Sequence, residues 1–286
     1  MENGFLLINK EQGKTSFETL FPIKRYFNTN HVGHAGTLDK FASGILIALV
    51  GKYTKLASYF ISLDKEYVAE FRFGLETDTL DPNGIIVNKT DYIPSLEDID
   101  LKLKDFVGEI YQSPPRFSSV HINGIRAYKL ALNGKFFEIK KRRVNVYDIQ
   151  RLSYDFSSSS LSLKITCSKG TYIRSIARDL AYSLNSCAYV SNLKRTKVGM
   201  FRLKDSTLCK NLSKASLISL ESLSSFEKVY IDSSKINLVK NGAYIEVQIN
   251  INEFKILKSR EGEILAVIEG IGFNKYKYVI IYYNLS

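Results

Sequence analysis

The chain has few cysteines and no long apolar run. Its three cysteines, Cys167, Cys187 and Cys209, are odd in number and widely spaced, which fits neither a disulfide framework nor a zinc site. The longest aliphatic run, residues 45–50, is far shorter than the roughly 20 residues that span a bilayer. The first residues lack the basic and apolar segments of a signal peptide. We therefore expect a globular cytoplasmic protein with no membrane segment and no metal.

Acidic residues are too few to balance the basic ones. The 286 residues include 40 Lys and Arg but 29 Asp and Glu, which gives a net charge of +11. From Tyr230 onward, seven basic residues face six acidic ones, so the first 229 residues carry nearly all of the excess. This excess favours nucleic acid or an anionic membrane as the partner, and the lack of a basic amphipathic helix favours nucleic acid. A lysine bias from an AT-rich genome is the alternative explanation.

The stretch of residues 31–55 joins a glycine-rich loop to an apolar strand. Glycines at positions 33, 36 and 44 let the backbone approach a ligand closely, and His34, Thr37 and Asp39 lie between them. The apolar residues 45–50 predict a buried strand, which would hold Asp39 at a rigid sheet edge. Asp39 is therefore a candidate catalytic carboxylate. An aspartate that only satisfies turn amides is the alternative.

Hydrophobic periodicity predicts the other elements. Alternating apolar residues indicate strands, and apolar residues three and four apart indicate helices. Tyr67 falls on the apolar side of one strand, where an aromatic side chain ordinarily belongs to the core. The predicted strands cover residues 5–8, 66–73, 161–167 and a long run from 140 to 156, and the predicted helices cover residues 15–27, 53–62, 95–106 and those after position 171.

Arg174 is out of place in the helix that Thr171 is expected to cap. The apolar stripe of this helix includes Ile173 and Leu180. A cation in the first turn opposes the helix macrodipole and stands where a capping box would have Glu or Gln. We therefore expect a carboxylate to hold Arg174 there. A surface arginine beside Arg178 is the alternative.

Several long strings resemble one protein family. The run GHAGTLDKFASGIL followed by GKYTK is similar to the signature of the TruB family of tRNA pseudouridine synthases, with Lys40 where the family has proline. The strings KEYVAEFRFGLETDTLDPNG, SKGTYIRSIARDL and LKRTKVGMF match further motifs of the family. The resemblance extends over residues 5–201. It implies a mixed α+β fold around a long, largely antiparallel sheet of the pseudouridine synthase type.

The resemblance assigns roles to residues of the site. It implies that Asp39 is the catalytic aspartate, which attacks the sugar or abstracts its C2′ proton, and that Tyr67 stacks on the target base and moves a proton. It pairs Arg174 with Asp39, whose carboxylate the guanidinium would keep ionised. His34 would help to splay the RNA loop. The remaining expected substrate-binding residues are Gly36, Thr37, Lys10, Tyr128, Lys194 and Arg195.

The resemblance also indicates what these binding residues contact. Lys10 is expected to contact RNA or the active-site loop, and Tyr128 is expected to wall the pocket together with the prolines of the string SPPRF. Lys194 and Arg195 alternate with Lys197 as on a strand edge that faces phosphate. The basic run at residues 140–143 is a further expected phosphate contact. Solvated surface residues and scaffold residues are the alternatives.

The implied reaction is the isomerisation of the T-loop uridine of tRNA, at position 55, to pseudouridine. No cofactor or metal is implied, the partner is the T-arm stem-loop of tRNA, and we expect a monomer. The chain is expected to divide into a catalytic domain of residues 1–229 and a small C-terminal β domain of residues 230–286. The string LVKNGAYI in the second part weakly resembles the PUA domains that bind RNA.

Two other functions are compatible with parts of the sequence. A non-catalytic RNA-binding protein would explain the charge, but it has no use for Asp39, Tyr67 and Arg174 together. A glycoside hydrolase also breaks a glycosidic bond, but it usually needs a second carboxylate. Only Asp78 or Asp81 stands in a comparable loop.

Overall fold

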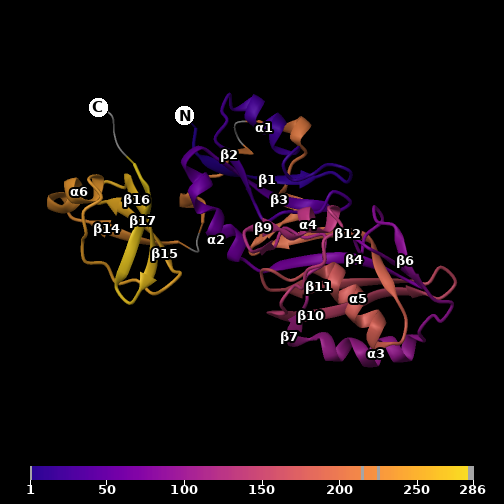
Figure 1. Cartoon of the computed structure of the whole chain (residues 1–286). Helices are drawn as coiled ribbons and strands as arrows, with labels where there is room; N and C mark the ends of the chain where they lie inside the picture. Colours follow the sequence, from indigo (N-terminus) through magenta and orange to yellow (C-terminus); the bar gives the residue numbers. More distant parts are fainter. Residues whose placement is uncertain (1, 214–215, 224–225, 283–286) are drawn as a thin grey trace.

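Two β-sheets organise the computed structural model, which describes residues 2–213, 216–223 and 226–282 (Figure 1). Within these residues, the strands of the long sheet follow the order β1-β3-β12-β4-β11-β10-β7, with β2 beside β3 and β13 beside β12. Neighbouring strands are antiparallel, except that β12 runs parallel to β3. The strands are β1 (Gly4–Lys10), β2 (Val32–Ala35), β3 (Ser43–Val50), β4 (Lys65–Phe73), β7 (Gly108–Gln112), β10 (Arg142–Asp155), β11 (Ser160–Cys167), β12 (Ala188–Val198) and β13 (Phe201–Arg202).

Strands β3 and β4 form where the apolar patterns predicted them. All of residues 45–50 in β3 are fully buried. The odd-numbered ones share an apolar cluster with Phe60 of α2 (Ala57–Ser62), and Ala48 and Val50 share another with Ile23 of α1 (Leu20–Tyr26). In β4, buried residues alternate with partly exposed ones. One face of β4 therefore packs on the core while the other faces solvent, as its period-two pattern indicates.

Two helices cover the buried face of β4 and β11. They are α5 (Ile173–Ser183) and α3 (Leu96–Leu103), which contribute Ile176, Leu180 and Ile99 to one apolar cluster with both strands. The helices predicted at residues 15–27, 53–62 and 95–106 are present but shorter. Their first or last turns are irregular or belong to the 3₁₀ helices η1 (Gly51–Leu56) and η2 (Lys104–Phe106).

The predicted N-cap of α5 is wrong. The N-cap residue is Tyr172, and no side chain of that residue caps the helix. The side-chain amide of Gln112 on β7 instead binds the backbone of this residue: Oε1 accepts from the Tyr172 N–H at 2.8 Å, and Nε2 donates to the Tyr172 carbonyl at 3.0 Å. Thr171 instead donates its hydroxyl to the carbonyl of Ser168. The start of α5 is therefore fixed by a distant strand.

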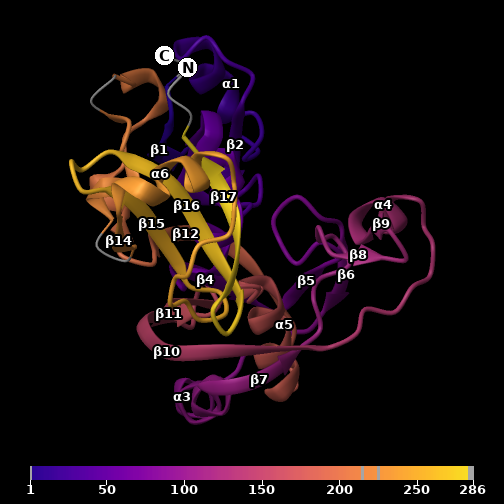
Figure 2. The ribbon, with the colours of Figure 1, turned by 90° about the vertical axis from the view of Figure 1, so that its left-hand side faces the viewer.

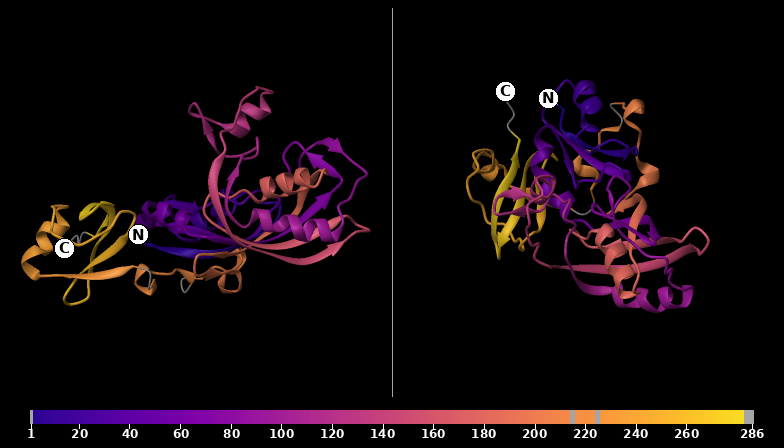
Figure 3. Two further views of the ribbon diagram at one scale, coloured as in Figure 1. Left: turned by 90° about the horizontal axis from the view of Figure 1, so that it is seen from below. Right: turned by 45° about the vertical axis from the view of Figure 1, so that its right-hand side comes forward.

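Residues 113–141 form an arm between β7 and β10. The arm contains the short strands β8 (His121–Ile122) and β9 (Ile125–Arg126) and the helix α4 (Ala127–Leu132). Figures 2 and 3 show that these elements stand away from the long sheet. A separate hairpin pairs β5 (Leu75–Thr77) with β6 (Ile86–Lys89), and β5 contacts β12 of the long sheet.

The C-terminal part forms a second sheet, which packs against α2. In the described residues its strands follow the order β14 (Glu227–Ile231), β15 (Phe254–Ser259), β16 (Ile264–Gly272) and β17 (Lys275–Ile281), and α6 (Ser233–Lys240) lies between β14 and β15 in the chain. The ring centroid of Tyr59 on α2 lies 4.6 Å from that of Phe226 and 5.3 Å from that of Phe254. Since β14 begins at residue 227, the domain boundary expected between residues 229 and 230 falls inside this strand.

Short 3₁₀ helices connect β13 to the second sheet. Those in the described residues are η3 (Leu203–Asp205), η4 (Cys209–Asn211) and η6 (Leu220–Ser222). The architecture confirms the predicted α+β fold, with a long and largely antiparallel sheet followed by a small C-terminal β domain. Among the described helices, none is both long enough and apolar enough to cross a membrane.

The parallel contact between β3 and β12 joins the two halves of the long sheet. Gly44 lies opposite Arg195 in this contact. Gly44 has φ +110°, and a Cβ atom built there would lie 2.2 Å from the Arg195 carbonyl oxygen. Only glycine therefore allows the two strands to approach this closely, immediately after the loop that carries Asp39.

We predict that Gly44→Ala destabilises the protein far more than Gly108→Ala. Both glycines have positive φ, but a Cβ at Gly108 meets no atom within 4 Å. The control therefore measures the backbone strain alone, about 1–3 kcal/mol, whereas overpacking at Gly44 adds about 1–3 kcal/mol. Urea unfolding of both variants tests this. Equal losses of unfolding free energy would show that the strands do not need the close approach.

Candidate active site

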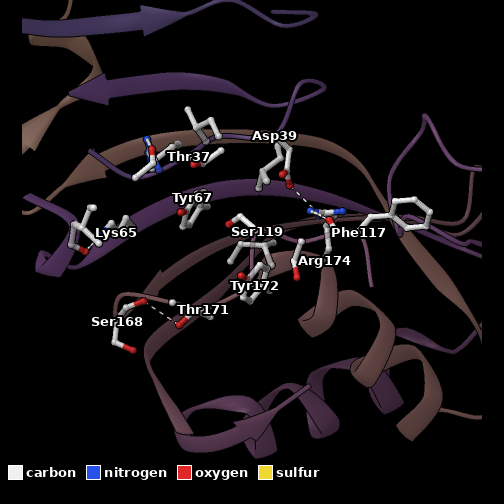
Figure 4. Close-up of a pocket in the computed structure, with 18 of the residues that line it drawn as sticks. Thr37, Asp39, Lys65, Tyr67, Phe117, Ser119, Ser168, Thr171, Tyr172 and Arg174 are labelled. Carbon is white, nitrogen blue, oxygen red and sulfur yellow. Dashed lines mark hydrogen bonds and ion pairs between the residues drawn. The ribbon is translucent and has the colours of Figure 1, made fainter. Parts of the chain in front are cut away.

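A cavity of about 560 Å³ opens beside the N-terminus of α5 (Figure 4). Its walls come from the end of β2, the loop before β3, the strands β4 and β12, the start of α5, and the arm. This volume is within the range that small-molecule sites occupy. Eight of the ten predicted site residues line it: His34, Gly36, Thr37, Asp39, Tyr67, Tyr128, Arg174 and Arg195.

Arg174 forms an ion pair with Asp39, as predicted. Its Nε lies 2.9 Å from Asp39 Oδ2, and the Arg174 side chain is 5% exposed. Its other nitrogens are also occupied: Nη1 donates to the Thr79 carbonyl at 2.7 Å and to Asp81 Oδ2 at 3.3 Å, and Nη2 donates to the Phe117 carbonyl at 3.2 Å. The guanidinium therefore holds the Asp39 carboxylate from a position that is itself fixed on every side.

Burial and charge act in opposite directions on Asp39. Its side chain is about one-third exposed, and loss of hydration raises the pKa of its carboxyl group. The Arg174 guanidinium opposes this rise, and the negative charge of Asp81 adds to it. Arg174 does favour the ionised form of Asp39, as expected, because it acts to lower the pKa of that carboxyl group. The net pKa of Asp39 nevertheless lies above the ordinary carboxyl value, because burial is the larger effect.

The loop that carries Asp39 is braced by its backbone. Leu38 donates its N–H to Ser16 Oγ at 2.9 Å and accepts from the same hydroxyl at 3.1 Å. The Lys40 carbonyl accepts from the N–H of Gly13 at 2.8 Å. Two contacts from the N-terminal segment thus flank Asp39, so the carboxylate is presented from a fixed loop.

Tyr67 lies in the cavity wall and is 9% exposed. It sits on β4 directly opposite Arg195 of β12. Burial raises the pKa of its hydroxyl, while the charge and hydrogen bonding of Arg195 oppose the rise. The hydroxyl therefore stays protonated at neutral pH, and the ring faces the same space as Asp39 (Figure 4).

The predicted phosphate contact of Arg195 is wrong. Arg195 is 1% exposed, and its Nε and Nη2 donate to the carbonyls of Ile45 at 2.8 Å and Gly36 at 3.0 Å. Alternation along β12 places Arg195 on the inner face with Leu193, and exposed Lys194 on the opposite face, away from the cavity. Arg195 therefore supports the active-site loop from inside, and the structure does not bring Lys194 to the site.

Lys10 is also buried, which contradicts the expected contact with RNA. It is 0% exposed, and its Nζ donates to the carbonyls of Glu11 and Lys14. Burial lowers the pKa of Lys10 to about 8, with Asp39 acting to raise it and Arg195 to lower it. The positive charge of Lys10 in turn acts to lower the pKa of Asp39 in the active-site loop.

Two polar atoms in the cavity wall have no hydrogen-bond partner. They are His34 Nδ1 and Ser118 Oγ, both buried. Burial and the nearby charge of Arg195 lower the pKa of His34, so its imidazole is neutral at pH 7. A neutral ring has one nitrogen free to accept, which suits contact with a substrate.

Several residues of the site were not predicted. Asp81 and Phe117 hold Arg174, while Lys65 and Tyr172 line the cavity. Lys65 is 7% exposed, and burial lowers its pKa to about 8. Lys65 and Tyr172 stand in the matched strings KEY and GTYIR, which offered a signal for them. The prolines of SPPRF, expected in the wall, are buried outside it.

A basic chain that holds a carboxylate and a guanidinium in a ligand-sized cavity has the features of an enzyme that acts on nucleic acid. The family model described as "TruB family pseudouridylate synthase (N terminal domain)" matches residues 24–173. The chain is 95% identical over 282 residues to tRNA pseudouridine synthase B of Borrelia garinii subsp. bavariensis. The matched residues cover 99% of this chain and 100% of that protein. The chain belongs to the TruB family.

More distant proteins agree with this assignment. The protein named tRNA pseudouridine synthase B of Francisella philomiragia is 41% identical over 241 residues, which cover 83% of this chain and 79% of that protein. A chain of the crystal structure of a Cbf5-Nop10-Gar1 complex has a TM-score of 0.72 at 22% identity, covering 98% of this chain and 84% of its own. The similarity to this solved structure confirms the predicted pseudouridine synthase type of fold.

We predict that Lys10 makes stability depend on pH. Its pKa of about 8 in the folded protein is below the unfolded value, so between the two values the unfolded chain binds more protons and stability rises with pH. Replacing it by methionine removes this dependence. The unfolding free energy of wild type minus that of Lys10→Met should therefore increase by about 1 kcal/mol from pH 7 to pH 9.

Denaturant unfolding at the two pH values measures this difference. Lys194→Met, at an exposed position, is the control for removing a lysine. A difference between wild type and Lys10→Met that stays constant with pH would mean that Lys10 is hydrated in solution.

Proposed function

We propose that this enzyme isomerises the uridine at position 55, in the T-arm loop of tRNA, to pseudouridine. The family makes the chain a pseudouridine synthase, and its relatives act on tRNA by their names. The observation that carries the proposal is the Asp39 carboxylate held by Arg174 in a cavity with an aromatic wall. The T-arm as the binding site and Asp39 as the reacting group are the parts that we propose.

The reaction moves one bond of the nucleoside. The N1–C1′ bond of uridine breaks, the uracil turns, and a C5–C1′ bond forms. C5 loses a proton and N1 gains one, so the composition of the nucleoside does not change. Asp39 acts on the ribose, either as a nucleophile at C1′ or as a base at C2′, and both steps require the ionised carboxylate.

The other residues of the cavity hold the nucleotide. A base inside a stacked RNA loop must be flipped out before chemistry, and Tyr67 offers a ring on which the flipped uracil stacks. His34, Thr37 and Tyr128 line the cavity from two different segments, and they contact the flanking RNA. The Gly36 backbone, with its carbonyl held by Arg195, allows the RNA to approach.

The charge and the second sheet extend the binding surface. We propose a catalytic domain up to about residue 226 and a C-terminal domain from β14 onward, which contributes to RNA binding. We also propose that the enzyme acts as a monomer. A tRNA substrate supports a cytoplasmic location.

The position of Asp81 argues against a glycoside hydrolase. That reaction needs a second carboxylate free to act as acid or base on substrate or water. Asp81 is 7% exposed and does not line the cavity. Its carboxylate oxygens are engaged by Arg174, Thr79 and the backbone N–H of Asn83. It therefore supports Arg174 instead of facing a substrate.

We predict that Asp39→Asn abolishes conversion but leaves tRNA affinity within about threefold of wild type, because phosphate contacts supply most of the affinity. The assay is release of tritium from an unmodified tRNA transcript labelled at uracil C5, with no added cofactor. Asp91→Asn, at an exposed position, is the matched control. Free uracil as a product would indicate a hydrolase, and full turnover by Asp39→Asn would remove Asp39 from the chemistry.

We predict that Arg174→Ala shifts the acid limb of the pH–rate profile to higher pH. Conversion needs ionised Asp39, so the rate falls as pH drops through the pKa of this group. Since the guanidinium opposes the rise of that pKa, its removal raises the pKa further. The plateau rate should also fall by at least about 100-fold, which corresponds to about 2.7 kcal/mol, because the carboxylate loses its orientation.

Arg174→Lys separates charge from geometry. Lysine keeps the positive charge, so the acid limb of the profile should stay close to that of wild type. It lacks the planar guanidinium whose donors reach three segments, so the plateau rate should remain low. The measurements are single-turnover rates between pH 4 and pH 8 at saturating tRNA, with thermal midpoints for both variants. A normal plateau and an unshifted limb in the alanine variant would exclude the pair from the reaction.

A further inference from the structure

Ser118 is an exception among the buried serines of the described residues. Ser16, Ser175 and Ser186 donate their hydroxyls to backbone carbonyls, and Ser259 Oγ accepts from the Glu263 N–H. Ser118 is 4% exposed, yet its Oγ has no hydrogen-bond partner. Buried hydroxyl groups are nearly always paired in folded proteins, so an unpaired one indicates a partner that arrives from elsewhere.

The backbone around Ser118 is firmly placed. The Phe117 carbonyl accepts from Arg174 Nη2 at 3.2 Å, and the Ser118 carbonyl accepts from the N–H of Tyr128 at 3.1 Å. The Val120 carbonyl accepts from the Ala127 N–H at 2.7 Å. These bonds fix the main chain that carries the Ser118 hydroxyl. One of them comes from Arg174, the residue that orients Asp39.

Ser118 also lines the cavity that contains Asp39 and Tyr67. Within the described residues, three buried side-chain atoms lack a partner, and two of them, His34 Nδ1 and Ser118 Oγ, belong to residues that line this cavity. The hydroxyl of Tyr172 is a polar neighbour of Ser118, but it does not complete a hydrogen bond of ordinary geometry. The unpaired atoms therefore collect where a substrate binds.

We infer that the Ser118 hydroxyl donates a hydrogen bond to a carbonyl oxygen of the flipped uracil. This inference rests on the proposed function. Uracil carries carbonyl oxygens at C2 and C4, on either side of N3. A half turn of the ring about the axis through N3 and C6 exchanges N1 with C5 and, at the same time, O2 with O4. A donor aimed at one carbonyl before the turn therefore meets the other carbonyl after it.

This symmetry gives Ser118 a use in both halves of the reaction. The bond to the first carbonyl holds uracil while the N1–C1′ bond is intact, and the bond to the second holds it with C5 facing C1′. The hydroxyl gains its missing partner in both orientations and contributes to keeping the free base in place. Ser118 is therefore a residue that positions the base, and tRNA affinity as a whole depends on phosphate contacts elsewhere.

The test combines Ser118→Ala with sulfur substitution in the substrate. Sulfur accepts hydrogen bonds poorly, so T-arm tRNA carrying 2-thiouridine or 4-thiouridine at the target position removes the carbonyl partner. Ser118→Ala should lower the single-turnover rate at saturating unmodified tRNA by about 3- to 10-fold, as expected for loss of one hydrogen bond. The dissociation constant of tRNA should change by less than about twofold, and the thermal midpoint should not fall.

The coupling between the two changes is the decisive measurement. A thio substitution that slows wild type should slow Ser118→Ala by a clearly smaller factor, because the hydrogen bond is already absent. Ser118→Thr keeps a hydroxyl and should recover part of the rate. Ser153→Ala is the matched control, since Ser153 of β10 is exposed and does not line the cavity, and it should convert tRNA as wild type does.

Each result has one interpretation. Wild-type rates in Ser118→Ala, or thio effects that are equal in wild type and the variant, overturn the role of Ser118 while leaving the proposed function intact. A lower thermal midpoint with equal thio effects shows that the hydroxyl is structural and also overturns it. If wild type itself converts no uridine in the T-arm, the proposed function fails first, and the inference fails with it.

Discussion

The buried guanidinium of Arg174 is the constraint on which the site depends. A buried charge must be paired and its donors satisfied, or it destabilises the fold by several kcal/mol. Arg174 meets this requirement only with acceptors from three separate segments: Asp39, the turn that contains Thr79 and Asp81, and Phe117 of the arm. The same contacts that stabilise the charge therefore fix the carboxylate, the turn and the root of the arm relative to one another.

A second buried arginine does the corresponding work on the other side of the cavity. Arg195 donates to the carbonyls of Ile45 and Gly36, and its own backbone is in close contact with Gly44. The loop that presents Asp39 is thus held at both ends, where β3 and β12 join the halves of the sheet. Lys10 and Lys65, both buried with a lowered pKa of about 8, add positive potential close to the site. That potential suits a polyanionic substrate.

Position in the sheet also explains why neighbouring cations of one strand have different surroundings. The buried faces of β4 and β12 carry Tyr67 and Arg195, while alternation turns Asn192 and Lys194 to the opposite face. The C-terminal sheet is not a loosely tethered addition, because Phe226 and Phe254 pack on Tyr59 of α2. Any RNA contact that it makes is therefore held at a fixed position relative to the cavity.

The sequence by itself determined the elements whose causes are local. The alternation in residues 66–73 and the apolar run at 45–50 define strands. A cation in the first turn of a helix requires a carboxylate, and the family resemblance identified Asp39 as the one that pairs with Arg174. Burial and partners far along the chain were decided only by the tertiary structure. Lys10 and Arg195 are long cationic side chains that belong by default on the surface, but packing encloses them and supplies carbonyl acceptors. Likewise, Asp81 and Ser118 acquire their places only when three distant segments converge on one guanidinium, which no local pattern encodes.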